Sequence, residues 1–312
     1  KKGASIFATL TNWSHGDAYD RTGTLFTLSE KKAKSMLDAL QNGLDELPVV
    51  TDNLGKHYQG FTSTMEYEVP VELMRFFTSF GVSHFNEIRE IENYPWQDSV
   101  VYKQEITSLI PNNQNEIWIG VFIGNYDRGG HQVSLDLQFY PPWGEGRVAE
   151  KYIQPLFNTV NIMEMSGQNY GRLFRYDTLE MDFEIPENVS GLEMLFTTTG
   201  HGGWGGGDEF NPKLNQIFVD DELVFSHIPW RTDCGTYRMS NPASGNFQNG
   251  LSSSDLSRSN WCPATLTPPF RINMSRLRPG KHHIQVVIDQ GEEEGNSFSS
   301  WCVSGVLVGD KK

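Results

Sequence analysis

The chain has 312 residues, which is enough for two domains of about 150 residues each. Hydrophobic residues make up 38% and charged residues 21%, a composition that excludes a disordered chain. With 25 basic and 39 acidic residues the net charge is −14, which excludes a protein that tracks nucleic-acid phosphates or docks on anionic lipid. No apolar run approaches the roughly 20 residues that cross a bilayer. No signal peptide is visible, so we expect a processed or trimmed chain.

Short segments in which apolar and polar residues alternate dominate the sequence. Clear examples are residues 117–123, 133–139, 179–185 and 284–288. Alternation with a period of two is typical of strands that rest one face on a core. Because such strands follow one another with short turns between them, antiparallel sandwiches are favoured. The sequence therefore predicts an all-β fold.

One segment near the start has the periodicity of a helix instead. Residues Glu30 to Leu44 follow Ser29, a candidate N-cap, and end before Pro48. The apolar residues on one face of this predicted helix are Met36, Leu37, Leu40 and Leu44. We interpret the segment as a short helical insertion in a β domain.

The stretch from Tyr140 to Gly146 contains two prolines and two glycines between predicted strands, and it is the best candidate for a linker. It divides the chain into a first domain at residues 1–141 and a second at residues 146–312.

Three cysteines are present: Cys234, Cys262 and Cys302. Their wide spacing argues against a structural zinc site, but leaves open one disulfide together with one buried thiol. His282 and His283 are adjacent and would point to opposite faces of a strand. We therefore expect no metal site and no cofactor.

The first candidate catalytic segment is 17–21, with Asp17, Tyr19, Asp20 and Arg21, where a polar loop meets a predicted strand. Two carboxylates beside a guanidinium are suited to general-base catalysis. Taken alone, the same residues also fit a solvated turn.

A second candidate is Asp208-Glu209, which follows a stretch with six glycines at residues 200–207. Glycines allow the backbone to approach a ligand closely, so that a carboxylate at this point reaches a substrate. An exposed loop acid is the alternative.

The third candidate, residues 257–263, carries Arg258 and Trp261 beside Cys262. An indole for stacking and a forked donor suit sugar recognition. A loop held by a disulfide, with Trp261 as its apolar core, remains the alternative.

Together these segments resemble the peptide-N-glycosidase F family, bacterial amidases that remove N-linked glycans. Residues 209–220 are similar to the strand that carries the family's second active-site glutamate, residues 258–263 to its Arg-x-x-Trp-Cys-Pro loop, and residues 17–21 to its Asp-Glu-Trp-Asp-Arg segment. The resemblance covers nearly the whole chain. It implies two adjacent eight-stranded antiparallel jelly-roll domains, with the active site at their junction.

The resemblance also implies roles for individual residues. Asp20 corresponds to the general base and Glu209 to a second catalytic acid. The substrate would be bound by six side chains: Tyr19, Arg21, His201, Trp204, Arg258 and Trp261. A disulfide is implied between Cys234 and Cys262, which leaves Cys302 as a thiol.

The implied activity is hydrolysis of the amide bond between an asparagine side chain and the first GlcNAc of an N-linked glycan, which gives aspartate and a glycosylamine. The implied partner is an N-glycosylated protein or peptide. We expect a monomer that is secreted or periplasmic, or held at the cell surface of a bacterium.

The sequence departs from the family pattern on the predicted strand at residues 117–123. Phe122 stands where the family has a third active-site glutamate, and Gly124 stands where it has an aromatic residue. The change at Phe122 removes hydrogen bonds to sugar hydroxyls, and the change at Gly124 leaves room beside the first GlcNAc.

Three other functions remain open. A glycoside hydrolase also uses two carboxylates, but it cleaves a sugar–oxygen bond. A non-catalytic N-glycan-binding protein agrees with the loss of the acid at Phe122. A copper monooxygenase shares the paired jelly-roll architecture, although the sequence lacks its clustered histidines.

Overall fold

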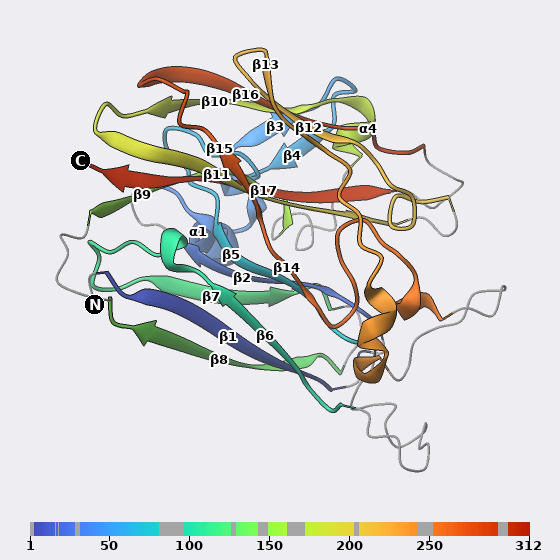
Figure 1. Cartoon of the computed structure of the whole chain (residues 1–312). Helices are drawn as coiled ribbons and strands as arrows, with labels where there is room; N and C mark the ends of the chain where they lie inside the picture. The colour runs from blue at the N-terminus through green and yellow to red at the C-terminus, as the bar shows by residue number, and fades with distance from the viewer. Residues whose placement is uncertain are drawn as a thin grey trace, which may run out of the picture.

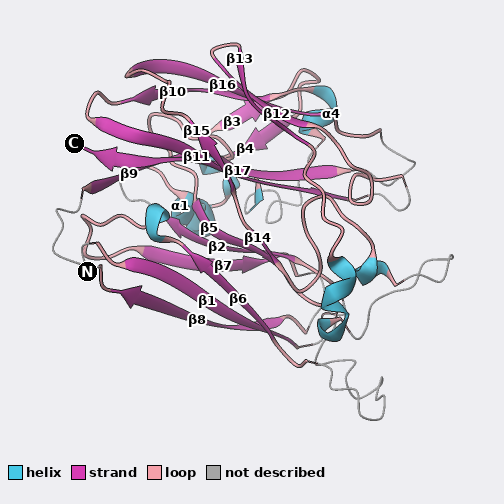
Figure 2. Ribbon diagram, viewed as in Figure 1, coloured by secondary structure: helices cyan, strands magenta, loops and turns pink. Residues whose placement is uncertain are grey.

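The computed structural model describes residues 3–15, 17, 19–28, 32–80, 97–125, 129–142, 149–160, 172–202, 206–241, 252–292 and 299–312. Strands dominate it and helices are short (Figure 2). Two β-sandwiches are stacked, with the second above the first in Figure 1. The predicted all-β architecture is therefore confirmed. No helix in these ranges is long and apolar enough to cross a membrane.

The first sandwich consists of two antiparallel sheets. One contains, in spatial order, β6 (Val100–Glu105), β1 (Ser5–Ser14) and β8 (His131–Tyr140). The other contains β14 (Leu266–Thr267), β5 (Val71–Phe77), β2 (Thr22–Leu28) and β7 (Trp118–Ile123). Its core includes Leu10, Leu25 and Phe76. Since β14 comes from the C-terminal half of the chain, that half completes a sheet of the first sandwich.

In the described residues the second sandwich has eight strands, as expected, and the first has seven. Its outer sheet contains β10 (Leu179–Ile185), β16 (Gly280–Ile288), β12 (Asn215–Val219) and β13 (Glu222–His227). Its inner sheet contains β15 (Phe270–Asn273), β11 (Val189–His201), β17 (Ser300–Lys311) and β9 (Glu150–Asn158). One face of the inner sheet packs on the core around Phe196, Ile217 and Val286. Its other face meets the first sandwich, where Leu195 and Val306 join the core of that domain.

Among the short helices only α1 (Met36–Asn42) lies in the predicted helical segment, and it starts later than predicted. Ser35 is the N-cap, because its hydroxyl accepts a hydrogen bond from the Leu37 amide and Asp38 accepts one from the Ser35 amide. Ser29 lies outside the described residues. Leu40 is exposed, contrary to prediction, whereas Met36 is buried. The remaining short helices are η1 (Leu44–Glu46), η2 (Thr107–Leu109), α4 (Leu173–Tyr176), η3 (Cys234–Ser240) and η4 (Ser253–Asp255).

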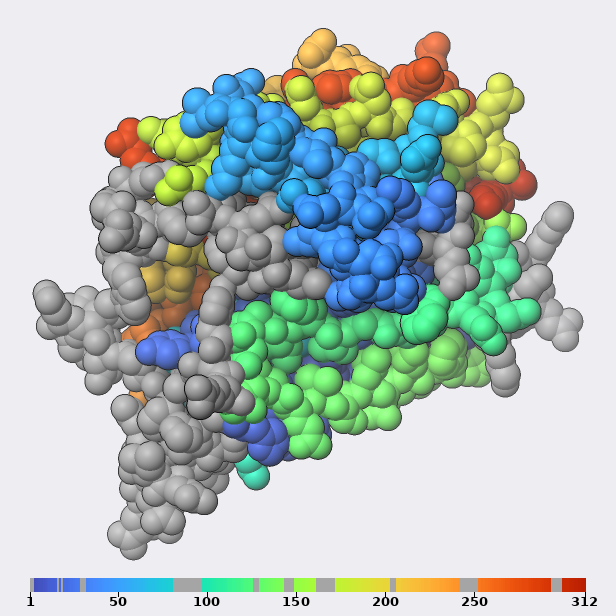
Figure 3. All heavy atoms as spheres, turned by 180° about the vertical axis from the view of Figure 1, so that it is seen from behind, coloured from blue at the N-terminus to red at the C-terminus, as the bar shows by residue number. Residues whose placement is uncertain are grey.

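The segment from α1 to β5 crosses from one sandwich to the other. It contains the hairpin of β3 (Val49–Thr51) and β4 (His57–Gln59), and Tyr58 and Phe61 from this region join the core of the second sandwich. Figure 3 shows the segment in blue, lying over both sandwiches from behind. The predicted division at residues 141–146 remains a prediction, since residues 143–148 lie outside the described ranges.

Candidate active site

The loop that carries Asp20 joins β1 to β2 and is held against the end of β5. The amide of Arg21 donates to Thr78 Oγ1 at 2.8 Å, and the amide of Thr78 donates to the carbonyl of Arg21 at 2.9 Å. Asp20 precedes this pair of hydrogen bonds, so its position is set by the first sandwich.

Glu209 is positioned by the second sandwich, in the loop between β11 and β12. Its amide donates to the carbonyl of Gly202 at 3.4 Å, and its carbonyl accepts from the Ser259 amide at 3.0 Å. At Gly200, near the end of β11, a Cβ atom would lie 2.8 Å from the Cβ of Ser259, so only glycine allows this strand and the loop of Ser259 to approach this closely.

Arg258 joins the two acids. Its Nη1 donates to Glu209 Oε1 at 2.5 Å, and its Nη2 lies 3.7 Å from Asp20 Oδ2. The guanidinium carbon lies 4.7 Å from the ring centres of both Phe210 and Trp261, which hold it from two sides. Arg258 is 1% exposed, whereas the side chains of Asp20 and Glu209 remain 14% and 20% exposed. The acids thus face an accessible space and the arginine supports them from behind.

Burial and mutual repulsion govern the charge of the two acids. Burial raises the pKa of Glu209 to about 7, helped by the negative charge of Asp20 and opposed by Arg258. Burial also raises the pKa of Asp20, against the attraction of Arg258 and Arg21. Two carboxylates that share one guanidinium retain a proton more readily than either would alone.

The guanidinium of Arg21 forms an ion pair with Asp17. Its Nε and Nη2 donate to the Asp17 carboxylate at 2.6 and 3.0 Å. Asp17 is fully buried, and His131 Nε2 lies 3.5 Å from its Oδ2. Burial alone would raise the pKa of Asp17, but His131 and Arg21 hold it well below its usual range. No pattern in the sequence indicates that His131, at the start of β8, joins this cluster. Tyr19 is 55% exposed, beside the Arg21 guanidinium.

Trp261 and His201 lie beneath the acids. Trp261 is 4% exposed and stacks on Phe77 with 4.3 Å between ring centres, while its Nε1 donates to the Gly200 carbonyl. A ring buried to this extent offers no face for sugar stacking, contrary to the expectation for Trp261. His201 packs beside Phe77 and Trp261, and burial lowers its pKa to about 3, helped by the positive charges of Arg75 and Arg258. Trp204 lies outside the described residues.

A disulfide joins Cys234 to Cys262, as the resemblance implied, and it fixes the loop that carries Arg258 and Trp261. Cys302 is a buried thiol in β17. Sequence reasoning missed the role of Asp208, which is fully buried and accepts hydrogen bonds from Trp301 Nε1 at 2.8 Å and from the Gly291 amide. These contacts fix the residue directly before Glu209.

Phe122, which the resemblance placed at the position of a family glutamate, is a half-buried ring in β7. It lies against a small cluster of Phe26, Leu28 and Met36, together with Leu37. Its ring therefore contributes to the attachment of α1 to the first sandwich. The amide of Gly124, two residues further along, donates to the carbonyl of Thr22 at 3.1 Å.

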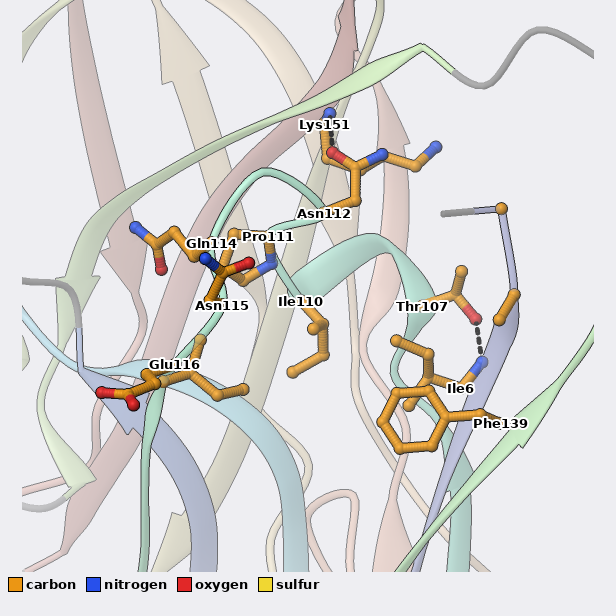
Figure 4. Close-up of a pocket in the computed structure, with 13 residues that line it drawn as sticks. Ile6, Thr107, Ile110, Pro111, Asn112, Gln114, Asn115, Glu116, Phe139 and Lys151 are labelled. Atoms are coloured by element: carbon orange, nitrogen blue, oxygen red, sulfur yellow. Dashed lines mark hydrogen bonds between the residues drawn. The ribbon is translucent and has the colours of Figure 1, made fainter. Parts of the chain in front are cut away.

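A separate cavity of about 540 Å³ lies at the other end of the first sandwich. Figure 4 shows its lining, with apolar Ile6, Ile110 and Phe139 and polar side chains that include Glu116. Ile6 is near the start of β1, whereas Asp20 lies beyond the end of that ten-residue strand, so this cavity is distant from the acids. In the part of the chain that is described, no three His, Cys, Asp or Glu side chains are grouped to hold a metal ion.

Family models and solved structures were compared with the chain. The N-terminal model of peptide-N-glycosidase F matches residues 1–139, and the C-terminal model matches residues 169–308. PNGF-II, solved in two crystal forms, is 49% and 50% identical, with TM-scores of 0.94 and 0.93. These matches cover 100% of this chain but 58% and 57% of the PNGF-II chains, so the present chain spans a little over half of their length.

A more distant structure is PNGase F, described as a glycosylasparaginase from Flavobacterium meningosepticum. It is 13% identical with a TM-score of 0.63, covering 99% of this chain and 85% of that one, which shows a shared fold alone. No curated protein matches the chain. Because models of both family domains match and half of the residues are identical to PNGF-II along the full sequence, the chain belongs to the peptide-N-glycosidase F family.

Proposed function

We propose that this protein is an amidase that hydrolyses the bond between an asparagine side chain and the first GlcNAc of an N-linked glycan. The observation that carries the proposal is the pairing of Asp20 and Glu209, from two different sandwiches, on the single guanidinium of Arg258. Membership of the peptide-N-glycosidase F family supports the same chemistry. The substrate is an N-glycosylated protein or peptide, and the enzyme acts as a monomer.

Asp20 serves as the base for water. Among the described residues its buried Oδ2 has no hydrogen-bond partner, so it is available to a water proton. The water oxygen attacks the amide carbon while Asp20 accepts one of its protons. General-base catalysis of this kind contributes about 10²–10⁴-fold.

Glu209 and Arg258 complete the reaction. As the carbon–nitrogen bond breaks, the sugar-bearing nitrogen takes a proton and leaves as a glycosylamine, and the former asparagine becomes aspartate. Glu209 is suited to hold the water and to deliver a proton, because its pKa of about 7 keeps it partly protonated near neutral pH. Arg258 stabilises the negative charge that develops beside the two acids.

Tyr19 and Arg21 lie at the edge of the site, where Tyr19 offers an exposed ring to the substrate. His201 and Arg258 border the acids from below, and we retain Trp204 as a proposed sugar contact. The disulfide supports an oxidising compartment. We therefore propose that the protein acts outside the cytoplasm of a bacterium, secreted, in the periplasm or at the cell surface.

The test is mass spectrometry of a defined N-glycopeptide after incubation with enzyme. We expect aspartate at the former attachment site with the wild-type protein. Asp20→Asn should abolish the product, and Glu209→Gln should lower kcat by about 10²-fold or more, since each removes a proton acceptor or donor. Both variants should remain folded. Glu222→Gln, an exposed glutamate in β13, is the matched control and should turn over normally.

Other outcomes identify the alternatives. A shortened glycan that leaves a sugar on asparagine indicates a glycoside hydrolase. Glycopeptide binding without any product indicates a glycan-binding protein. Wild-type turnover by Asp20→Asn overturns the assignment of the base.

A further inference from the structure

A buried ion pair lies on β5, between the two sandwiches. Arg75 is 1% exposed and Glu72 is 6% exposed, and Arg75 donates to both carboxylate oxygens of Glu72, at 2.8 and 3.0 Å. Residues three apart on a regular strand point to opposite faces. Here a β-bulge at Leu73 adds one residue to β5 opposite β2, which brings both side chains to the face that meets the second sandwich.

The pair bonds directly to the inner sheet of the second sandwich. Arg75 Nη1 donates to the Cys302 carbonyl at 2.6 Å and to Thr199 Oγ1 at 3.2 Å. The Ser304 hydroxyl donates to Glu72. Thr199 and Cys302 are register partners in β11 and β17, so the contacts converge on one place in that sheet. A slip of either strand would break these bonds and leave Arg75 Nη1 buried without an acceptor.

Such a pair is a poor source of stability. Removing two charges from water costs several kcal/mol, and apolar replacements of buried ion pairs are often neutral or stabilising. Hydrogen bonds that can form in only one relative position of two sheets instead favour that position over all others.

On each side of this contact, the residue three positions further along the chain makes hydrogen bonds that hold one of the two acids in place. On β5, three residues after Arg75, Thr78 makes the two backbone-directed hydrogen bonds that fix Arg21, next to Asp20. On β11, three residues after Thr199, Gly202 accepts the hydrogen bond from the Glu209 amide. The relative position of β5 and β11 thus sets the separation of Asp20 from Glu209.

We propose that Glu72 and Arg75 are positioning residues, and that the hydrogen bonds of this ion pair to β11 and β17 align the two sandwiches so that Asp20 and Glu209 share Arg258. Only the expected effect on kcat rests on the proposed amidase function. The structural consequence, the separation of the two acids, is measurable without substrate.

The test uses the double variant Glu72→Leu/Arg75→Met, which removes both charges together. We expect it to fold, with kcat lowered at least tenfold and KM changed less than threefold. Carbon-13 NMR titration of the Glu209 carboxyl, assigned with Glu209→Gln, should show its pKa shifted toward the ordinary value of about 4.5, since Asp20 moves away and water enters. Arg258 faces the same carboxyl and is unchanged.

Ser63→Ala is the matched control. It removes another bond between the halves of the chain, from the Ser63 hydroxyl to the Pro155 carbonyl, together with the bond that the same hydroxyl accepts from the Val69 amide. Neither bond involves a residue that holds Asp20 or Glu209. It should lower the melting temperature without changing kcat or the Glu209 titration. If the double variant fails to fold, Ser304→Ala provides the same readout with a smaller shift in the same direction. An unshifted Glu209 titration in the folded variant overturns the proposal, whereas a wild-type protein without amidase activity overturns only the proposed function.

Discussion

Arg258 holds a full positive charge under nearly complete burial. Two acids face it, so the site carries a net negative charge when both are ionised. Retaining one proton removes that repulsion, which is why the pKa of Glu209 rises to about 7 although Arg258 attracts the ionised form. The site is therefore arranged to hold one base and one acid near neutral pH.

This arrangement makes folding stability depend on pH. Because the pKa of Glu209 is raised in the folded state, the folded protein binds this proton more tightly than the unfolded chain does. The resulting contribution to the free energy of unfolding is complete below about pH 4.5 and is lost as the pH rises through about 7. Glu209→Gln should flatten this decline, as measured by urea unfolding across that range. The exposed Glu222→Gln should keep the wild-type decline, and an unchanged decline in Glu209→Gln would refute the raised pKa.

Sequence reasoning identified the three segments of the site but not how their side chains pair. Arg21 adjoins Asp20 in the sequence, yet its guanidinium bonds to Asp17. Arg258 is distant in sequence and lies between the acids. Trp261 was expected to contact the substrate, with an apolar core of its loop as the alternative, and it is buried because its ring packs on Phe77 from the other sandwich. These side-chain contacts depend on how the two sandwiches pack against each other, and a local sequence pattern does not reveal that packing.

Among the elements, the strand that carries Phe122 packs against the helical segment. In β7 the ring packs with Met36 and Leu37 of the α1 region, so an apolar residue is required where that segment covers the sheet. The apolar side chain of Phe122 and the helical segment at α1 thus pack against each other.

Restoring the family acid should therefore harm this protein. Phe122→Glu should lower the free energy of unfolding by about 2 kcal/mol, since a half-buried ring is lost and a carboxylate is placed against apolar side chains. Phe122→Leu, which keeps the site apolar, should cost less than about 1.5 kcal/mol. Urea unfolding measures both. A fully stable Phe122→Glu that binds N-glycan more tightly would show instead that the carboxylate reaches the active site.

Strands were predicted better than the helix, and the reason is physical. Alternation in segments such as β10 and β16 reflects one buried face, which is a local property of the chain. The start of α1 is set by the reciprocal bonds of Ser35 and Asp38, which the apolar periodicity does not reveal. Leu40 fits the helical periodicity, but its side chain is exposed.

At the scale of the whole molecule, the two sandwiches exchange parts. The C-terminal half contributes β14 to the first sandwich, and the β3–β4 hairpin brings Tyr58 to the core of the second. A sequence divided at a proline-rich linker does not reveal such exchange, because the exchanged segments are short and lie far from the linker.

The disulfide supports this assembly at the interface. Its cysteines are 28 residues apart, and closing a loop of that size stabilises the fold by about 3–4 kcal/mol in the chain-entropy description. Cys234→Ser/Cys262→Ser should lose about that much and also lose kcat, because the loop that holds Arg258 is released. Unfolding free energies and glycopeptide turnover measure the two effects.

Thiol counting provides the control. Alkylation in denaturant without reductant should label one cysteine, Cys302, and label three after reduction. Three labelled thiols in protein kept oxidised would contradict the disulfide, and a stable, fully active double variant would contradict its role.

The position of β17 has a consequence for the order of assembly. This strand is close to the end of the sequence, yet it occupies an interior place in its sheet and supplies the Cys302 carbonyl to Arg75, a residue 227 positions earlier. During synthesis, the loop with Asp20 is made long before β17 and has no aligned partner until that strand is present. Contacts over such separations close slowly. The arrangement of Asp20, Glu209 and Arg258 is therefore completed only after β17 has joined its sheet, and the proposed activity would depend on that step.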